Sequence, residues 1–185
     1  MARNVSIEGF VIVSADGMLA DANGVMPRAL MFEDDQKFFF GALARAAISV
    51  HGRFSKEQDA GSPLRKRLWV THRVPAVAPD PANANAWMWN PDGASFDQAL
   101  QAAGVSEGLV AVVGGGRVFR LFLSIGYDAF HLSRAGRVRL PGGRLAFPVE
   151  PLKPPEEVLR EAGLTPGPTQ LLDATNDVTL TTWRR

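Results

Sequence analysis

The feature that most constrains the fold of this chain is a continuous apolar run that ends in three consecutive glycines. The run, Leu109 to Val113, has glycine on both sides, a pattern typical of a strand buried on both faces of a sheet. The triplet Gly114 to Gly116 follows, and Val118 to Ser124 is predicted to be a helix. This strand, turn and helix together indicate an α/β protein with a largely parallel sheet.

Other segments repeat the alternation of strand and helix. Strands are predicted at Val5 to Ser14, Ala47 to Val50, Leu68 to Thr71, Ala129 to Leu132, Leu171 to Asp173 and Val178 to Trp183. Helices are predicted at Asp34 to Ala46 and Phe96 to Ala103, the second opened by a capping box of Ser95 and Gln98. We expect a single domain over residues 1–185, with a three-layer α/β/α fold and a mostly parallel central sheet that has an antiparallel C-terminal edge.

Four further segments give weaker signals. Met18 to Leu30 is predicted to be a long loop, because it holds glycine, asparagine and proline. Pro75 to Asn85 contains three prolines and is predicted to be extended or irregular. Trp87 to Trp89 is predicted to be a short edge strand. The proline-rich stretch Pro148 to Pro168 is expected to wrap the domain, with a helical turn or two within it.

The residue counts exclude several classes of function. The sequence has no cysteine, which excludes disulfides, thiolate zinc sites and cysteine nucleophiles and is typical of a reducing cytoplasm. Its 20 basic and 19 acidic residues give no broad positive field, so no nucleic acid partner is expected. We find neither an export signal nor an apolar stretch of the roughly 20 residues that cross a membrane. His51, His72 and His131 lack metal-ligand spacing, so no metal is expected.

The glycine triplet is also a candidate ligand site. Glycines at the end of a buried strand let the backbone approach a ligand closely, and the helix that follows presents free N–H groups to an anion. A tight turn alone needs one or two glycines, whereas this chain has three. The sequence matches neither the G-x-G-x-x-G pattern nor a Walker motif, so we interpret the triplet as a phosphate cradle of another kind.

Four blocks of residues together resemble the dihydrofolate reductase superfamily. They are the segments Val112 to Leu123, Ser14 to Ala20 and His51 to Arg53, with the helix that begins near Glu33. Their order and spacing are most similar to the reductase domain of bifunctional riboflavin-biosynthesis deaminase-reductases, over roughly residues 6 to 148. The resemblance implies an NADPH-dependent reductase with the fold of that superfamily.

The resemblance also implies where the cofactor binds. In such proteins the strand-end glycines pack against the diphosphate, and residues after the next two strands meet the phosphates of the adenosine half. These roles correspond here to Gly52, Arg53, Ser55, Thr71, His72, Arg73, Gly114, Gly115, Gly116, Arg117 and Val118. Two arginines and a histidine favour NADPH over NADH, because arginine pairs well with an additional phosphate. A solvated surface charge remains the alternative interpretation of Arg73.

The loop from Ala15 to Arg28 resembles the mobile loop that covers the nicotinamide in these enzymes. Gly17 suits a hinge and is counted among the cofactor contacts. Met26-Pro27 is similar to the Met-Pro of dihydrofolate reductases, but Arg28 replaces the tryptophan expected next. A cation at this position favours a phosphorylated or carboxylated substrate over a bare pterin ring, so Arg28 is a predicted substrate contact.

The same resemblance implies a catalytic carboxylate early in the first long helix, four residues before a phenylalanine. Asp34 with Phe38 and Asp35 with Phe39 fit this spacing equally well. We favour Asp34 as the catalytic residue, keep Asp35 as the second candidate, and expect Phe38 to line the substrate site. Acidic residues at a helix N-terminus are also routine partners of the helix dipole, which is the competing interpretation.

Two more residues are candidates for substrate binding. Arg65 lies near the position of an arginine that binds the glutamate tail in folate-reducing members, although Arg65 to Arg67 is also a charge run at a loop. Ser133 follows the strand at Ala129 to Leu132, where the family has a hydroxyl residue near the substrate.

The sequence leaves three functions open. The first is a riboflavin-biosynthesis reductase that acts on a pyrimidine or pteridine substrate, of the 5-amino-6-(5-phosphoribosylamino)uracil reductase type. The second is dihydrofolate reductase, which Met26-Pro27, Asp34 and Arg65 favour and Arg28 opposes. The third is a non-catalytic NADPH- or flavin-binding module. We expect a homodimer that pairs through the sheet edge formed by Val178 to Trp183.

Overall fold

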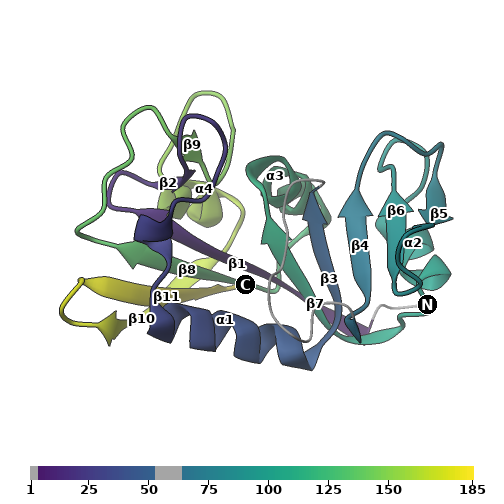
Figure 1. The fold of residues 1–185 in the computed structure, drawn as a ribbon, viewed down its shortest axis with the longest axis horizontal. Helices are drawn as coiled ribbons and strands as arrows, with labels where there is room; N and C mark the ends of the chain where they lie inside the picture. The colour runs from purple at the N-terminus through teal and green to yellow at the C-terminus, as the bar shows by residue number, and fades with distance from the viewer. Residues whose placement is uncertain (1–3, 53–63) are drawn as a thin grey trace.

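Figure 1 shows the computed structural model of the chain, which describes residues 4–52 and 64–185. Its strands are β1 (Asn4–Ser14), β2 (Met18–Ala20), β3 (Ala46–Gly52), β4 (Arg67–Val70), β5 (Val77–Pro79), β6 (Ala86–Trp89), β7 (Glu107–Gly114), β8 (Ala129–Ala135), β9 (Arg144–Leu145), β10 (Thr165–Asp173) and β11 (Val178–Arg184). Its helices are the 3-10 helix η1 (Arg28–Leu30) and the α-helices α1 (Glu33–Arg45), α2 (Phe96–Ala102), α3 (Gly116–Ile125) and α4 (Pro155–Glu161).

One large sheet organises the molecule, with its strands in the order β10-β11-β8-β1-β7-β3-β4-β6-β5. The central pairs are parallel, because β1 pairs in this sense with β7 and β8, β3 with β7 and β4, and β4 with β6. Strand β11 runs antiparallel to both β8 and β10. The predicted mostly parallel sheet with an antiparallel C-terminal edge is therefore confirmed.

The opposite edge of the sheet is also antiparallel, which the sequence analysis did not predict. Val77–Pro79 forms β5 and pairs with β6, so the segment expected to be extended or irregular contains the edge strand. Prolines are tolerated at a sheet edge, where the missing N–H is not needed by a neighbour. The predicted edge strand at Trp87 to Trp89 is instead the inner strand β6, which has β4 and β5 on its two sides.

Helices cover both faces of this sheet and give the predicted three layers (Figure 1). On one face, Ala42 and Leu43 of α1 pack with Phe10 of β1 and Ala111 of β7. On the other face, residues of α2, α3 and α4 join the larger core cluster, among them Phe119 and Phe122 of α3. Between the two layers, Val110, Ala111 and Val112 of β7 are fully buried, as the apolar run predicts.

The route expected for dimer formation is not open in this fold. Val178 to Trp183 was expected to form the sheet edge that pairs with a second copy, but this segment lies in β11, which has β8 on one side and β10 on the other. The exposed edge belongs to β10, which carries Pro166 and Pro168. Proline cannot donate a backbone hydrogen bond, so this edge is poorly suited to pair with a second copy.

The loop between β1 and α1 is more ordered than the sequence predicts. Met18–Ala20 forms β2 and pairs with β9, a contact across more than a hundred residues that no local pattern indicates. The stem of the loop is held by Asp16, whose carboxylate accepts hydrogen bonds from the Ser14 hydroxyl at 2.5 Å and from the backbone amide of Leu140 at 3.0 Å. These donors lower the pKa of Asp16, the Ser14 hydroxyl most strongly. No helix in the described part of the chain is long and apolar enough to cross a membrane.

A polar group is also built into the layer beneath α1. The His131 ring lies between Glu8 Oε2, at 2.7 Å from Nε2, and Thr182 Oγ1, at 3.0 Å from Nδ1. The Phe10 ring stacks on the His131 ring, with centroids 4.6 Å apart. The Phe38 ring of α1 packs against the same His131 ring in an edge-on arrangement, with centroids 5.3 Å apart. The hydrogen bond from His131 lowers the pKa of Glu8 more than burial raises it.

Replacing Glu8 by glutamine is expected to lower the free energy of unfolding at pH 7 by about 1 kcal/mol, because a charge-assisted hydrogen bond is lost. The folded pKa of Glu8 lies below its ordinary value of 4.5. The stabilisation is therefore present above pH 4.5 and is lost as the pH falls through the folded pKa. Urea unfolding at several pH values measures this, with Glu107→Gln, at an exposed position, as the control. An equal effect of Glu8→Gln at all pH values would contradict the prediction.

Candidate active site

The carboxyl ends of the parallel strands meet at one edge of the sheet, where open α/β sheets bind ligands. The turn after β1, the end of β3, Thr71 after β4 and the glycines after β7 all lie there, because these strands run in the same direction. The sequence analysis placed most of its candidate residues on these strand ends. The fold therefore brings these candidates to the same edge.

The N-terminus of α3 follows β7 directly, and within residues 4–52 and 64–185 no N-cap side chain closes it. Gly115 is the N-cap residue, no side chain caps the helix, and its first turn holds no acidic residue. Among the described residues, a Cβ atom on Gly115 would have no heavy atom within 4 Å apart from its chain neighbours, so this backbone lies beside space that they leave open. Arg117 in the first turn is exposed, whereas Val118 is buried and anchors the turn to the core.

The other two glycines of the triplet have structural reasons to be glycine. Gly114 has a φ of +111°, a backbone conformation that other residues rarely adopt. Gly116 packs closely against the chain around β9, where a Cβ would lie 3.0 Å from the Leu145 carbonyl oxygen. Within the triplet, only Gly115 combines a negative φ, −79° with ψ −160°, and space that the described residues leave open. The triplet therefore has two packing positions and one open position.

These features fit an anionic group such as the diphosphate of a dinucleotide. The helix dipole and uncapped N–H groups favour negative charge at this end of α3. Gly52, at the end of β3, faces the same turn, since a Cβ on it would lie 3.5 Å from Val118 and 3.7 Å from the Gly115 nitrogen. The two other residues expected near this phosphate, Arg53 and Ser55, lie outside the described residues.

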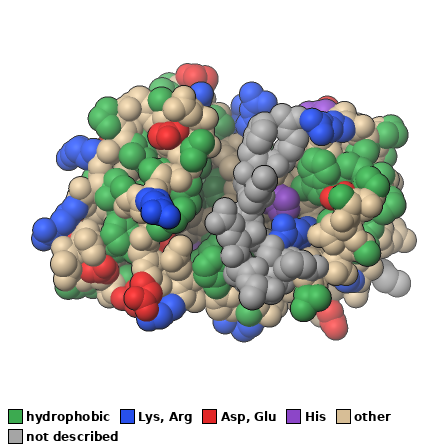
Figure 2. All heavy atoms as spheres, viewed as in Figure 1, with side chains coloured by type: hydrophobic (Ala, Val, Ile, Leu, Met, Phe, Trp, Pro, Cys, Tyr) green, Lys and Arg blue, Asp and Glu red, His purple; other side chains and the backbone are tan. Residues whose placement is uncertain are grey.

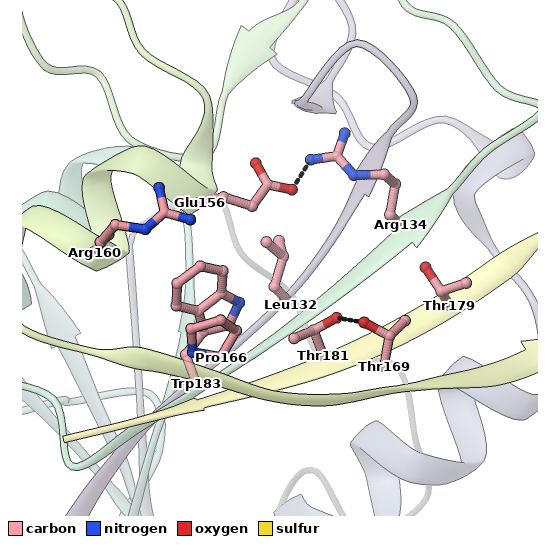
Figure 3. Close-up of a pocket in the computed structure, with 9 residues that line it drawn as sticks. All are labelled: Leu132, Arg134, Glu156, Arg160, Pro166, Thr169, Thr179, Thr181 and Trp183. Atoms are coloured by element: carbon pink, nitrogen blue, oxygen red, sulfur yellow. Dashed lines mark hydrogen bonds and ion pairs between the residues drawn. The ribbon is translucent and has the colours of Figure 1, made fainter.

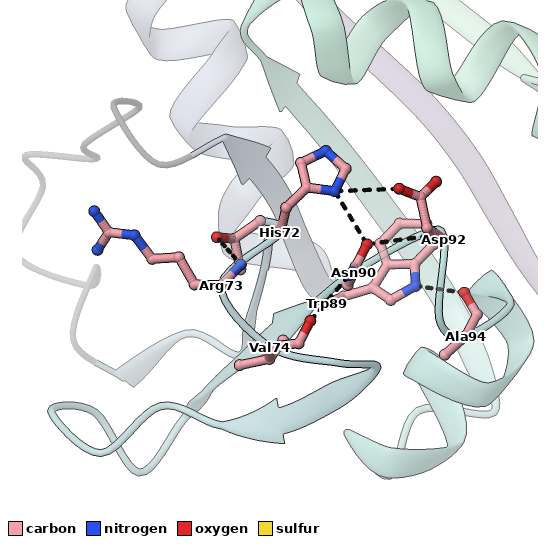
Figure 4. A network of polar contacts seen from close by, with 8 residues as sticks. His72, Arg73, Val74, Trp89, Asn90, Asp92 and Ala94 are labelled. Atoms are coloured by element: carbon pink, nitrogen blue, oxygen red, sulfur yellow. Dashed lines mark hydrogen bonds and ion pairs between the residues drawn. The ribbon is translucent and has the colours of Figure 1, made fainter.

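The segment after β4 carries the side chains predicted to meet an adenosine phosphate. Thr71 is buried, donates its backbone N–H to the Trp89 carbonyl oxygen at 2.8 Å, and accepts the Arg73 N–H on its hydroxyl at 3.2 Å. His72 and Arg73 are exposed. Figure 4 shows that the Arg73 guanidinium extends away from the polar network around His72.

That network contains an acidic residue that the sequence analysis missed. His72 Nδ1 lies 3.2 Å from Asn90 Oδ1 and 3.4 Å from Asp92 Oδ2 (Figure 4). Asn90 is fixed in turn by a hydrogen bond from its side-chain amide to the Val74 carbonyl oxygen at 2.9 Å. In the sequence, the Asn-Pro-Asp turn after β6 is the feature that could have indicated this acidic residue. Its closeness to His72 follows from the pairing of β4 with β6, which no local pattern shows.

The structure separates the two candidate carboxylates at the start of α1. The side chain of Asp34, which the sequence analysis favoured, is 53% exposed and lies 3.6 Å from Lys37 Nζ. Asp35 is buried and carries a hydrogen bond from the Ser133 side chain of β8. Burial raises the pKa of Asp35 more than this hydrogen bond lowers it. The geometry therefore favours Asp35 over Asp34 as a residue that exchanges a proton.

The predicted substrate contacts do not all lie together. Ser133 is buried and its side chain hydrogen-bonds to Asp35, so these two candidate residues lie together. Phe38 points instead to the sheet, where its ring contacts Phe10 and His131. Arg65 donates from Nε to the Leu43 carbonyl oxygen at 3.1 Å, near the end of α1. This helix contact gives Arg65 a structural role in the fold.

Gly17 and Arg28 bound the loop that follows β1. Gly17 has a φ of +83° and its backbone N–H bonds to the Ser14 carbonyl oxygen at 3.0 Å, which closes the turn. Arg28 begins η1 and is exposed, as are Val25 and Met26 before it. The side chains of Val25 and Met26 are 60% and 42% exposed.

The charge distribution gives no other strong candidate site. On the face shown in Figure 2, basic and acidic side chains are interspersed instead of gathered in one patch. Over residues 4–52 and 64–185, no group of three or more histidine, aspartate and glutamate side chains is placed to hold a metal ion. The glycine turn and the Asp35–Ser133 pair are thus the features that best support chemistry.

Comparisons with known proteins were made for the sequence and for the structure. No family model and no curated protein sequence matches the chain. Among solved structures, a riboflavin biosynthesis protein from Shewanella sp. PV-4 is similar with a TM-score of 0.65 and 18% identity, over 97% of this chain and 98% of that chain. Dihydrofolate reductase from Enterococcus faecalis, in complex with NADP(H) and RAB-propyl, is similar with a TM-score of 0.64 and 17% identity, over 97% of this chain and 96% of that chain.

A third similar structure is a diaminohydroxyphosphoribosylaminopyrimidine deaminase/5-amino-6-(5-phosphoribosylamino)uracil reductase from Thermotoga maritima. Its TM-score is 0.62 at 14% identity, over 98% of this chain and 56% of that chain, so this protein spans about half of the bifunctional one. All three likenesses extend over nearly the whole of this chain. The protein therefore has the fold that dihydrofolate reductase shares with the riboflavin-biosynthesis reductases, as the sequence motifs predict.

Proposed function

We propose that this protein is an NADPH-dependent reductase that acts on a pyrimidine- or pteridine-type substrate, of the riboflavin-biosynthesis reductase type. The observation that carries the proposal is the combination, at one edge of the sheet, of an open anion-binding turn and a buried carboxylate. Gly115 supplies the first, and Asp35 with its partner Ser133 supplies the second. An anion-binding turn alone would suit many nucleotide-binding proteins, whereas a carboxylate of raised pKa at the same edge of the sheet favours proton transfer.

Each residue has a distinct task in this proposal. Bound NADPH would supply the hydride. The uncapped amides of α3 hold the diphosphate, and Arg73 pairs with the phosphate that distinguishes NADPH from NADH. Asp35 stays protonated to a higher pH than an exposed aspartate and donates a hydrogen bond or a proton to the substrate ring. The loop from Ala15 to Arg28 excludes water from the site when it closes.

The substrate class follows from Arg28 in this proposal. An exposed cation next to Met26-Pro27 attracts a phosphate or carboxylate on the substrate. Dihydrofolate reductase is the second candidate, and the likeness in fold to the enzyme from Enterococcus faecalis favours it. NADPH oxidation with dihydrofolate or with phosphoribosylaminopyrimidines separates the two. A protein that binds NADPH but turns over neither substrate class is a binding module.

Asp35→Asn is expected to lower kcat/KM by at least about 100-fold, because the proton donor is lost, while Asp34→Asn changes it less than about threefold. Wild-type activity should fall as the pH rises above the raised pKa of Asp35, and this decline should vanish in Asp35→Asn. Because burial disfavours the ionised form, the asparagine variant should also be more stable than the wild type at pH 7, an advantage that is lost at low pH. Equal activity loss in both variants would argue against the role of Asp35.

A pair of substitutions at Gly115 tests the anion site without damaging the helix. Asp and Asn are both good N-cap residues and have nearly the same size. The two variants should therefore unfold at similar temperatures, so that any difference between them in NADPH affinity reflects charge. Gly115→Asp should weaken NADPH binding at least about tenfold more than Gly115→Asn, because only the carboxylate repels the diphosphate. Calorimetric titration measures the two affinities. Equal affinities would show that the cofactor diphosphate does not bind at this turn.

Arg73→Gln tests the cofactor preference. The variant is expected to bind NADPH about tenfold more weakly and NADH unchanged, since a charge-assisted bond to the additional phosphate is lost. Fluorescence titration with the two dinucleotides provides its own control, because they differ only in that phosphate. If the variant loses affinity equally for both dinucleotides, or for neither, Arg73 is a solvated surface charge and does not bind the additional phosphate.

A further inference from the structure

A cavity of about 330 Å³ lies on the sheet face opposite α1, and none of the residues proposed for cofactor or substrate lines it. It is formed where α4 lies over β8, β11 and β10 (Figure 3). Its floor combines the apolar side chains of Leu132 and Trp183 with the hydroxyl groups of Thr169 and Thr181, which are 2.8 Å apart. A cavity of this volume accommodates a small organic molecule.

A buried donor in the wall of this cavity lacks a partner. The side chain of Trp183 is only 3% exposed, and within the described residues its indole Nε1 has no hydrogen-bond acceptor. Figure 3 shows this nitrogen on the side of the ring turned toward Leu132 and Thr181. Buried N–H groups are almost always paired, and an unpaired one costs free energy that an oxygen acceptor restores. The indole therefore favours a ligand that carries an acceptor.

The charged side chains that line the cavity sum to a net positive charge. Arg134 and Glu156 form an ion pair across it, so their formal charges cancel. Arg160 of α4 is exposed, and its guanidinium lies over the Trp183 ring, 5.7 Å from the ring centroid. A guanidinium is matched in geometry by a carboxylate, which takes two parallel hydrogen bonds. Arg160 is therefore placed to bind an anionic ligand over the indole.

We propose that this cavity is a second ligand site, for a small monoanionic carboxylate with a compact apolar body. The carboxylate pairs with Arg160 and accepts from the Trp183 indole once the exposed Arg160 side chain moves aside. The apolar body lies against Leu132. This inference does not depend on the proposed reductase function, because it uses none of the residues at the other edge of the sheet.

The same site is connected to the loop after β1. Nη1 of Arg134 donates to the carbonyl oxygens of Ser14 at 3.2 Å and Ala15 at 3.0 Å, while its other terminal nitrogen meets Glu156. Ser14 and Ala15 form the stem of the loop from Ala15 to Arg28. A carboxylate bound at Arg160 adds a negative charge to the cavity that Glu156 also lines, and it repels Glu156. This weakens the ion pair of Glu156 with Arg134 and changes the contacts of that stem. The ligand thus acts as an effector of the loop.

Titration of the full chain with benzoate, followed by ¹H–¹⁵N NMR, tests both parts of the proposal. The Trp183 indole N–H and the backbone amides of Ala15 and Asp16 should shift together and give one dissociation constant. Benzamide, the neutral isostere of benzoate, should bind at least about tenfold more weakly, because it lacks the charge. If millimolar benzoate leaves the Trp183 indole unmoved, no such site exists. Shifts at Trp183 without shifts at Ala15 would overturn the effector role.

A matched pair of variants tests the contribution of Arg160. Arg160→Gln removes an exposed charge at the cavity and should weaken benzoate binding about tenfold, whereas Arg120→Gln removes an exposed charge on α3 and should leave it unchanged. Both positions are exposed, so both variants are expected to fold. Equal affinities in the two variants would contradict the site. Trp183 resonances that move with protein concentration in the absence of benzoate would instead assign this face to self-association.

Discussion

The rest of the structure depends on the complete burial of one strand. Strand β7 lies between β1 and β3, both parallel to it, and its central residues have no contact with solvent. A strand in this position must be apolar on both faces and must satisfy its backbone within the sheet. Because it is parallel to its neighbours, all of them end at the same edge. The apolar run that identifies β7 in the sequence therefore also fixes where the candidate site lies.

Two helices of the same chain show what is unusual about this edge. The first turn of α2 is closed by a capping box, in which Ser95 accepts the Gln98 N–H at 3.2 Å and Gln98 accepts the Ser95 N–H at 2.8 Å. The first turn of α3 has no side-chain cap and no acidic residue. Helices usually satisfy these N–H groups locally, as α2 does. Helices α1 and α4 also lack a side-chain cap, but acidic residues in their first turns complement the helix dipole. Helix α3 has neither a cap nor an acidic residue, which supports an external anion as the missing partner.

The sequence was sufficient wherever a local pattern had one structural solution. The apolar run of β7, the capping box of α2 and the glycine turn are of this kind, and the fold class follows from their order. It was insufficient where a distant contact decided between equal patterns. Asp34 and Asp35 each precede a phenylalanine by four residues, and only the approach of Ser133 from β8 selects Asp35. The strands β2 and β5, and the position of Asp92 beside His72, likewise depend on pairing between segments far apart in sequence.

Burial of Asp35 is costly for the fold, and the surrounding contacts explain how this cost is limited. A carboxylate taken out of water becomes easier to protonate, and the neutral form needs few partners. The single hydrogen bond from Ser133 opposes this shift without cancelling it. The acidic residues that only stabilise the helix dipole, Glu33 and Asp34, remain in solvent and share Lys37. Within one turn of α1 the chain thus keeps two carboxylates exposed beside Lys37 and buries a third, Asp35, which is the proton donor in the function proposed above.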